Sequence, residues 1–87
     1  MASRTVVVGS SSGLHARPAA LVSQAAAAAA PATVLIGRPG EDGVDASSVL
    51  LLMSLGIAAG EEVVLASDDD AALDRLAELV ATDLDAS

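Results

Sequence analysis

Three short apolar runs rich in valine, isoleucine and leucine predict β-strands. β-branched residues favour strands, and each run is followed by glycine, serine, proline or aspartate, which are typical of turns. The predicted strands cover residues 4–9, 33–38 and 61–67. A fourth segment around Val44, after a turn at 38–43 that is rich in Pro, Gly and Asp, is only weakly specified.

Helical patterns separate these strands. The alanine-rich segment 16–30 predicts a helix, with Pro18 in its first turn, where a missing N–H removes no intrahelical bond, and Pro31 at its end. The run 49–56 is too apolar for its periodicity to distinguish a strand from a helix. Serines before the run and Gly56 at its end favour a short helix.

The clearest helical pattern covers residues 68–87. Its apolar residues recur at i, i+3, i+7 and i+11, which places them on one face of a helix. They are Leu73, Leu76, Val80 and Leu84. Three aspartates at 68–70 lie where negative charge stabilises a helix N-terminus.

The order of these elements predicts an α+β fold with one antiparallel sheet and helices packed on one side of it. With 87 residues, the chain suits one domain spanning 1–87, and it shows no convincing internal repeat. Because there is no Phe, Tyr or Trp, we expect a core built from Leu, Val, Ile, Ala and Met. Nothing in the sequence requires an oligomer, so we expect a monomer.

The charge balance excludes several kinds of partner. The formal net charge of −8 repels nucleic-acid backbones and anionic lipid surfaces. Cysteine is absent, and one histidine with scattered carboxylates does not indicate a metal site, so we expect no metal or cofactor. No apolar run approaches the roughly 20 residues of a membrane span, and the start of the sequence lacks a secretory core, so we expect a cytoplasmic protein.

The segment GLHARPAA, residues 13–20, contains the only histidine. At the start of a helix, the His15 imidazole lies beside N–H groups that have no intrahelical partner, and the positive helix end disfavours its charged form. A neutral histidine can act as a nucleophile that carries a covalent group. A phosphoryl group there would meet the backbone N–H groups of Ala16 and Arg17 and the planar guanidinium of Arg17. Gly13 can adopt whatever backbone conformation is needed to present the His15 imidazole.

Other interpretations of this segment have to be weighed. A lone histidine near a helix end is more often a helix cap or a surface residue, but His, Arg and Pro together at a helix start favour the phosphoryl site. A Ser-His-Asp triad is formally possible, although the sequence has no nucleophile-elbow pattern.

Residues 13–20 resemble the phosphorylation site of HPr, the family of histidine-containing phosphocarriers of the bacterial phosphotransferase system. The resemblance extends over nearly the whole chain. It implies an open-faced β-sandwich with a four-stranded antiparallel sheet and three helices on one face, and it places the fourth strand around residues 41–45.

The resemblance also implies a function. His15 would accept a phosphoryl group on Nδ1 from phospho-enzyme I, which phosphoenolpyruvate charges, and would pass it to enzyme IIA domains for carbohydrate uptake. Arg17 would hold the phosphate during both transfers. The protein would be a stoichiometric carrier that is regenerated in each cycle and not an enzyme.

The segment SSVLLLMSLG, residues 47–56, is similar to a second motif of the family. There a serine at the head of the middle helix is phosphorylated by an HPr kinase/phosphorylase, and Ser48 takes that position. A plain helix cap is the simpler interpretation of Ser47 or Ser48, and both roles can coexist.

An apolar docking surface beside the histidine is also implied by the resemblance. Its candidate residues are Leu21, Val49, Leu50 and Met53, for which ordinary core packing is the alternative. The sequence departs from many relatives by carrying Gln24 and alanines where basic residues are common in the first helix, and Leu51 where a glycine is common. We therefore expect partner surfaces that are more apolar than acidic.

Two alternative functions remain open. A carrier in a nitrogen-linked or otherwise specialised phosphotransferase chain would share all of these features. An adaptor that regulates enzymes or a transcription factor through the same surface would need neither His15 nor Arg17. An inert structural module would leave the histidine, arginine and proline at the helix start unexplained.

Overall fold

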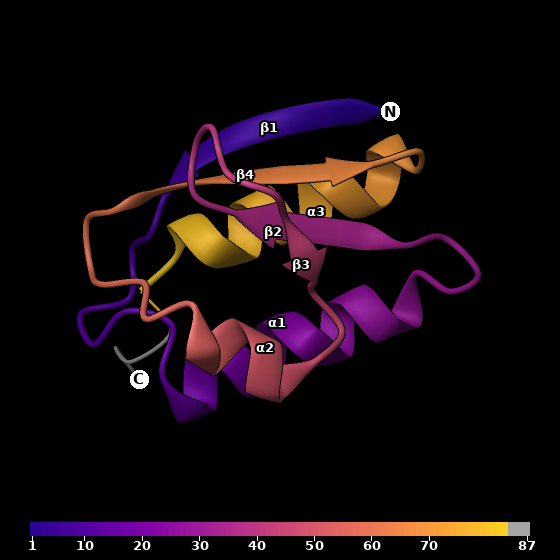
Figure 1. Cartoon of the computed structure of the whole chain (residues 1–87). Coiled ribbons are helices and arrows are strands. Elements are labelled where there is room, and N and C mark those ends of the chain that lie inside the picture. The colour runs from indigo at the N-terminus through magenta and orange to yellow at the C-terminus, as the bar shows by residue number, and fades with distance from the viewer. Residues whose placement is uncertain (84–87) are drawn as a thin grey trace.

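A computed structural model describes residues 1–83 and shows a four-stranded antiparallel sheet with three helices on one face (Figure 1). The elements are β1 (Ala2–Val7), α1 (Ala16–Ala28), β2 (Val34–Gly37), β3 (Val44–Asp45), α2 (Val49–Ser54), β4 (Glu62–Ser67) and α3 (Asp70–Ala81). The strand order is β1-β4-β2-β3, so the last strand pairs between the first and the second. The predicted α+β open-faced sandwich is therefore confirmed.

The first strand is shifted by two residues from its predicted position, and the other three strands are shorter than the sequence pattern predicts. The strand expected at 4–9 runs from Ala2 to Val7, because Gly9 donates its N–H to the Val80 carbonyl of α3, 3.0 Å away, and not to β4. The strand expected at 41–45 contains only Val44 and Asp45, which pair with β2. The strand predicted at 33–38 is one residue too long at each end, and the strand predicted at 61–67 is one residue too long at its start.

The first two helices also end earlier than expected. In α1 the last turn tightens, because Ala29 and Ala30 each donate to the carbonyl three residues back. Ala30 also precedes Pro31, and helical backbone is disfavoured for a residue before proline. Helix α2 ends at Ser54, with Leu55 as its C-cap and Gly56 beyond it at φ +63°. A residue in this left-handed conformation ends many helices, as the glycine predicts.

The helix predicted at 68–87 is wrong at both ends within the described residues. Asp69 is its N-cap, and the Asp69 carboxylate accepts the N–H of Ala72 at 3.1 Å, so Asp68 lies outside the helix. At the other end the backbone of Thr82 is extended, and the Val80 carbonyl accepts the N–H of Gly9. The predicted stripe position Leu84 lies outside the described residues.

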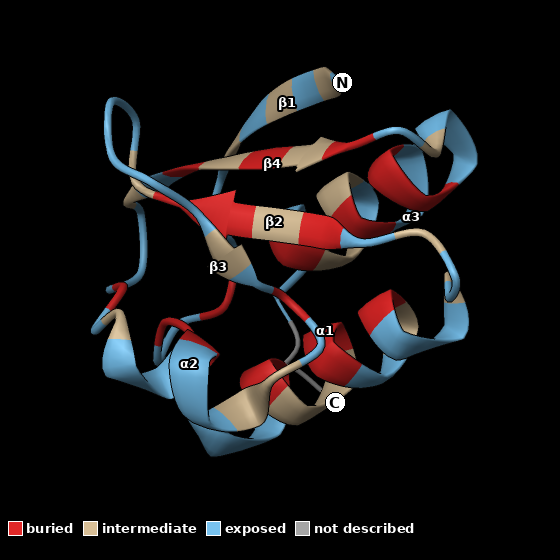
Figure 2. Ribbon diagram, turned by 45° about the vertical axis from the view of Figure 1, so that its right-hand side comes forward, coloured by how far each residue is buried: buried red, intermediate tan, exposed pale blue. Residues whose placement is uncertain are grey.

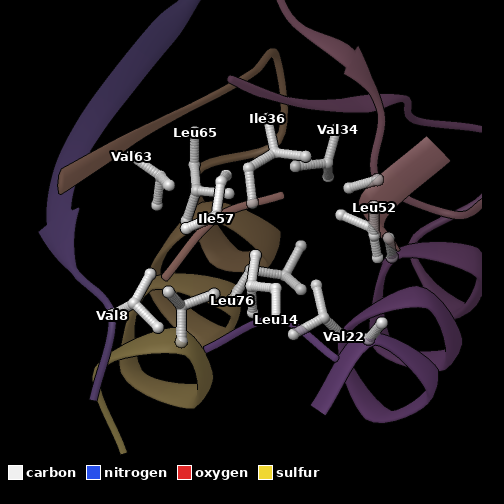
Figure 3. Packing of buried hydrophobic residues seen from close by; sticks show 14 of the residues in the cluster. Val8, Leu14, Val22, Val34, Ile36, Leu52, Ile57, Val63, Leu65 and Leu76 are labelled. Atoms are coloured by element: carbon white, nitrogen blue, oxygen red, sulfur yellow. The ribbon is translucent and has the colours of Figure 1, made fainter. Parts of the chain in front are cut away.

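The core lies between the sheet and the helices (Figure 3). Buried side chains from both layers and from two loops fill it: Val8, Leu14, Val22, Val34, Ile36, Leu52, Ile57, Val63, Leu65, Leu73, Leu76 and Val80. The expectation that methionine contributes to the core is wrong, because Met1 and Met53 are 74% and 42% exposed. Branched aliphatic side chains and alanine fill the space that aromatic rings occupy in many small domains.

Candidate functional site

His15 is the N-cap of α1 and lies on the surface. Its backbone is extended, with φ −87° and ψ −166°, and its carbonyl accepts the first helical bond from Ala19 at 2.8 Å. The His15 side chain makes no capping hydrogen bond to the first turn within the described residues. The imidazole is therefore presented to solvent at the helix start, and the interpretation of this histidine as a helix cap is wrong for its side chain.

Two buried residues fix the backbone on either side of His15. Leu14 precedes it and is only 3% exposed, with its side chain in the core (Figure 3). Pro18 follows in the first turn and is fully buried. An exposed reactive group between two buried anchors has a fixed origin, which favours a defined orientation for transfer chemistry.

Gly13 is required by the path of the loop before the histidine. Its φ is +73°, a conformation that side chains with a Cβ rarely adopt. A Cβ at this position would lie 2.4 Å from the carbonyl oxygen of Ile57. That same oxygen accepts the N–H of Leu14 at 3.1 Å, so the loop passes Ile57 closely enough to exclude any side chain.

Ala16 and Arg17 form the first turn of α1, and both are exposed. Their N–H groups belong to a turn that has no intrahelical acceptor, so they are suited to bind an anion at the helix start. Arg17 forms no ion pair with any residue from 1 to 83. Its guanidinium therefore remains available to bind an anion near the helix start.

Helix α2 lies beside α1 and is exposed over much of its length (Figure 2), and five of its six residues are apolar. Leu50 is 81% exposed, Met53 is 42% exposed and Val49 is half-buried, while Leu52 points into the core. Leu51, which sequence reasoning left out of the docking residues, is 40% exposed. We call the three exposed residues, together with the half-buried Val49, the α2 patch: Val49, Leu50, Leu51 and Met53.

Leu21 lies on α1 and is half-buried, as expected for a residue at the margin of such a surface. Exposure of α2 residues could not be predicted from a run that is apolar on every face. A hydrophobic surface on a short helix next to an exposed histidine is suited to transient docking of another protein.

Very little charge lies on the two helices that frame the histidine. Arg17 is the only charged residue of α1, and α2 has none. The acidic residues of the described chain lie on the loops, the strands and α3. The two helices that frame His15 are therefore nearly neutral, although the whole chain has a net charge of −8.

Ser48 is the N-cap of α2, which confirms the capping prediction. Its hydroxyl oxygen accepts the N–H of Leu51 at 3.3 Å. Ser47 instead donates its N–H and hydroxyl to the Asp45 carboxylate, at 2.9 and 2.7 Å. The hydrogen bond from the Ser47 backbone, followed by that from its side chain, lowers the pKa of Asp45. The two adjacent serines thus have different roles.

Residues 1–83 contain no group of three or more potential metal-ligating side chains. Across the same residues, no helix has both the length and the apolar character needed to cross a membrane.

Comparisons with known proteins agree with this geometry. The family described as "PTS HPr component phosphorylation site" matches residues 2–82. Phosphocarrier protein HPr of Streptomyces coelicolor is 48% identical over 98% of this chain and 94% of that protein. The crystal structure of a phosphocarrier protein HPr from Bacillus anthracis superposes with a TM-score of 0.82 at 34% identity, covering 91% of this chain and 95% of that one. HPr-C-His from Thermoanaerobacter tengcongensis gives a TM-score of 0.83 at 32% identity, covering 92% and 91% of the two chains.

Proposed function

Because this chain belongs to the HPr family of phosphocarrier proteins of the phosphotransferase system, we propose that His15 is the residue that carries the phosphoryl group. In this proposal, phospho-enzyme I donates the group and enzyme IIA domains of carbohydrate uptake receive it. The observation that supports it best is the exposed imidazole at the N-terminus of α1, held between two buried residues and uncommitted to capping.

The proposed reaction at His15 is an in-line transfer in each direction. The neutral imidazole Nδ1 attacks the phosphorus of the donor, so that a new N–P bond forms as the bond to the donor breaks. The N–H groups of Ala16 and Arg17 and the Arg17 guanidinium are placed to bind the phosphoryl oxygens and to stabilise the charge that they carry. The second transfer reverses these steps toward the acceptor and returns His15 to its initial state.

The protein is accordingly proposed to act as a stoichiometric carrier and not as an enzyme. A single domain, a monomeric state and a cytoplasmic location stay predictions from the sequence. The same holds for the choice between carbohydrate uptake and a specialised branch of the phosphotransferase system.

The direct test is the intact mass of the protein after incubation with phosphoenolpyruvate, magnesium and enzyme I. The expected result is a gain of one phosphoryl group that is lost in acid, as the N–P bond of a phosphohistidine requires. No gain under conditions that charge a control carrier would overturn the proposal and favour an adaptor function for the same surface.

Arg17→Ala is expected to slow charging of the protein about 10-fold to 100-fold, within the range for removing one charged group that stabilises a transition state. Arg17 is exposed, so the free energy of unfolding should change by less than about 0.5 kcal/mol. Rapid-quench measurement of phosphorylation by enzyme I checks this. The matched control is Arg75→Ala, which removes an exposed arginine from α3 and should charge at the wild-type rate. Equal rates for both variants would exclude Arg17 from the site.

The α2 patch and Leu21 are proposed as the docking surface for enzyme I and enzyme IIA. An apolar surface that is buried on binding gains free energy with the area removed from water. The near absence of charge on α1 and α2 supports apolar contacts as the main attraction, with little dependence on ionic strength.

Met53→Asp is expected to weaken binding of enzyme I about 10-fold or more, because a carboxylate would have to be desolvated inside the interface. Titration calorimetry with enzyme I measures the affinity. Val7→Asp is the control: Val7 is 53% exposed but lies on β1, away from α2. If both variants bind as wild type does, Met53 is not part of the docking surface.

Ser48 is proposed as a regulatory phosphorylation site for an HPr kinase/phosphorylase. A phosphate at the N-cap of α2 would be favoured by the helix dipole, so the fold would be retained. It would also add negative charge at the edge of the α2 patch and so weaken docking. Phosphoserine is stable in acid, so the intact-mass experiment distinguishes it from phosphohistidine.

A further inference from the structure

Arg38 and Glu61 form a two-pronged ion pair next to the segment that supports the histidine loop. Arg38 Nε donates to Glu61 Oε1 at 2.9 Å, and Arg38 Nη2 donates to Glu61 Oε2 at 3.3 Å. The two side chains are 31% and 34% exposed. Parallel N–H···O bonds of this kind fix the relative orientation of a guanidinium and a carboxylate.

Both side chains also bind the backbone between them. Arg38 Nη1 donates to the Leu55 carbonyl at 2.7 Å, and Nη2 donates to the Gly56 carbonyl at 3.2 Å. Glu61 Oε2 accepts the N–H of Ala58 at 2.6 Å. Arg38 thereby satisfies carbonyls at the C-terminal end of α2, where a cation is favourable. The hydrogen bond from Arg38, followed by that from Ala58, lowers the pKa of Glu61, and the bond to Glu61 raises the pKa of Arg38.

The residue enclosed by these bonds contacts the histidine loop directly. Ile57 lies between Gly56 and Ala58, its side chain is 2% exposed, and its carbonyl accepts the N–H of Leu14. Leu14 immediately precedes His15. Two hydrogen bonds and the peptide unit between Ile57 and Ala58 therefore connect the ion pair to the Leu14 amide, and the backbone of Leu14 leads on to the proposed phosphoryl site.

Stability alone is a poor explanation for this arrangement. A partly exposed ion pair contributes only about 0–1 kcal/mol to folding. Five hydrogen bonds that converge on residues 55–61 have a larger effect on geometry, because they restrict where the Ile57 carbonyl can lie. A misplacement of a reacting group by about 1 Å can reduce the rate of a transfer reaction about 100-fold.

We propose that Arg38 and Glu61 are positioning residues for phosphoryl transfer, which act on His15 through the Ile57 carbonyl and the Leu14 amide. This inference rests on the proposed function of His15. Neither residue lies in the helices that present the docking surface. The ion pair is therefore expected to affect the rate of transfer within the complex more than the formation of the complex.

Arg38→Gln tests this inference, with Arg4→Gln as the matched control. Arg4→Gln removes the same charge and also leaves an acidic partner. Arg4 lies on the edge strand β1, and its Nε is 3.4 Å from Oδ1 of Asp74 on α3. Steady-state charging by enzyme I is measured at increasing concentrations of each variant. Arg38→Gln is expected to lower kcat about 3-fold to 10-fold, with KM changed by less than about 2-fold. Arg4→Gln is expected to match wild type in both constants.

A second variant and a second measurement keep the test independent of folding losses. Glu61→Gln keeps an oxygen that can accept the Ala58 N–H in place of Oε2, but an NH2 group replaces Oε1, the acceptor of the Arg38 Nε–H. Hydrogen exchange of the Leu14 amide, followed by NMR, reports the Ile57–Leu14 bond without any transfer reaction. In Glu61→Gln this amide should exchange faster than in wild type, while amides of the central strand β4 keep their rates.

Three results would overturn the inference. These are a kcat for Arg38→Gln equal to that of Arg4→Gln, a rise in KM alone, and an unchanged Leu14 exchange rate in Glu61→Gln. Wild-type protein that enzyme I does not charge would instead remove the proposed function. The two failures are therefore distinguishable.

Discussion

His15→Ala is expected to abolish the gain of phosphoryl mass completely. Arg17→Ala, the other substitution at the phosphoryl site, should only lower the rate of this gain. The chain has no second histidine that could accept the group. A residual rate would need another nucleophile with the reactivity of a neutral imidazole, and serine hydroxyls lack it without an activating base. The measurement is intact mass after incubation with phosphoenolpyruvate, magnesium and enzyme I, followed by acid treatment.

The variant should fold as the wild-type protein does. His15 is exposed and its side chain makes no capping bond, so the free energy of unfolding should change by less than about 0.5 kcal/mol. Ser48→Ala is the matched control, because it removes the other proposed site of phosphorylation. It should gain the same acid-labile mass as wild type. Any gain of phosphoryl mass on His15→Ala, or no gain on any variant, would contradict the assignment of His15 as the carrier residue.

The candidate site was predictable because local chemistry determines it. Pro18 and the alanine run specify where the first helix starts, and that start places His15 at the N-cap. Likewise, a serine before an apolar run and a glycine after it gave both ends of the middle helix to within two residues. In each case residues within a few positions of one another suffice, since capping and turn formation are short-range effects.

The remaining features depend on contacts between segments that lie far apart in the sequence. Helix α3 ends at Ala81, where Gly9, more than seventy residues earlier in the chain, donates its N–H to the Val80 carbonyl. A Cβ at position 9 would collide with the Ala81 carbonyl, so this approach requires glycine. The sequence pattern places Arg38 where a predicted strand meets a predicted turn. No neighbouring residue in the sequence indicates that its side chain binds Glu61. Such pairings have no periodicity and no motif, so only the folded chain reveals them.

The exposure of the α2 patch was undetermined for a different reason. Periodicity assigns the buried face of a helix only when polar residues mark the opposite face. The run from Val49 to Met53 has no polar residue, although Leu52 is fully buried and Leu50 is 81% exposed. The shortness of α2 leaves it packed on one side against α1 and β3. Tertiary packing, and not the sequence pattern, selects its outer face.

Gly13→Ala is expected to lower the free energy of unfolding by about 2–5 kcal/mol, the largest stability loss among the changes considered. Two effects add at this position. The backbone has φ +73°, which costs a residue with a Cβ about 1–2 kcal/mol. The new Cβ would also lie 2.4 Å from the Ile57 carbonyl oxygen, so the loop must move and the Leu14–Ile57 hydrogen bond must lengthen or break.

Gly40→Ala separates these two effects. Gly40 has φ +81°, but a Cβ added there meets no atom within 4 Å. Its expected loss is therefore the backbone cost alone, about 1–2 kcal/mol, measured like the first by urea unfolding with linear extrapolation. Equal losses for the two variants would show that the close approach of Gly13 to Ile57 contributes nothing to stability. A larger loss for Gly13→Ala, together with slower charging of the protein that remains folded, would show that this contact also positions His15, since Leu14 cannot leave Ile57 without moving the next residue.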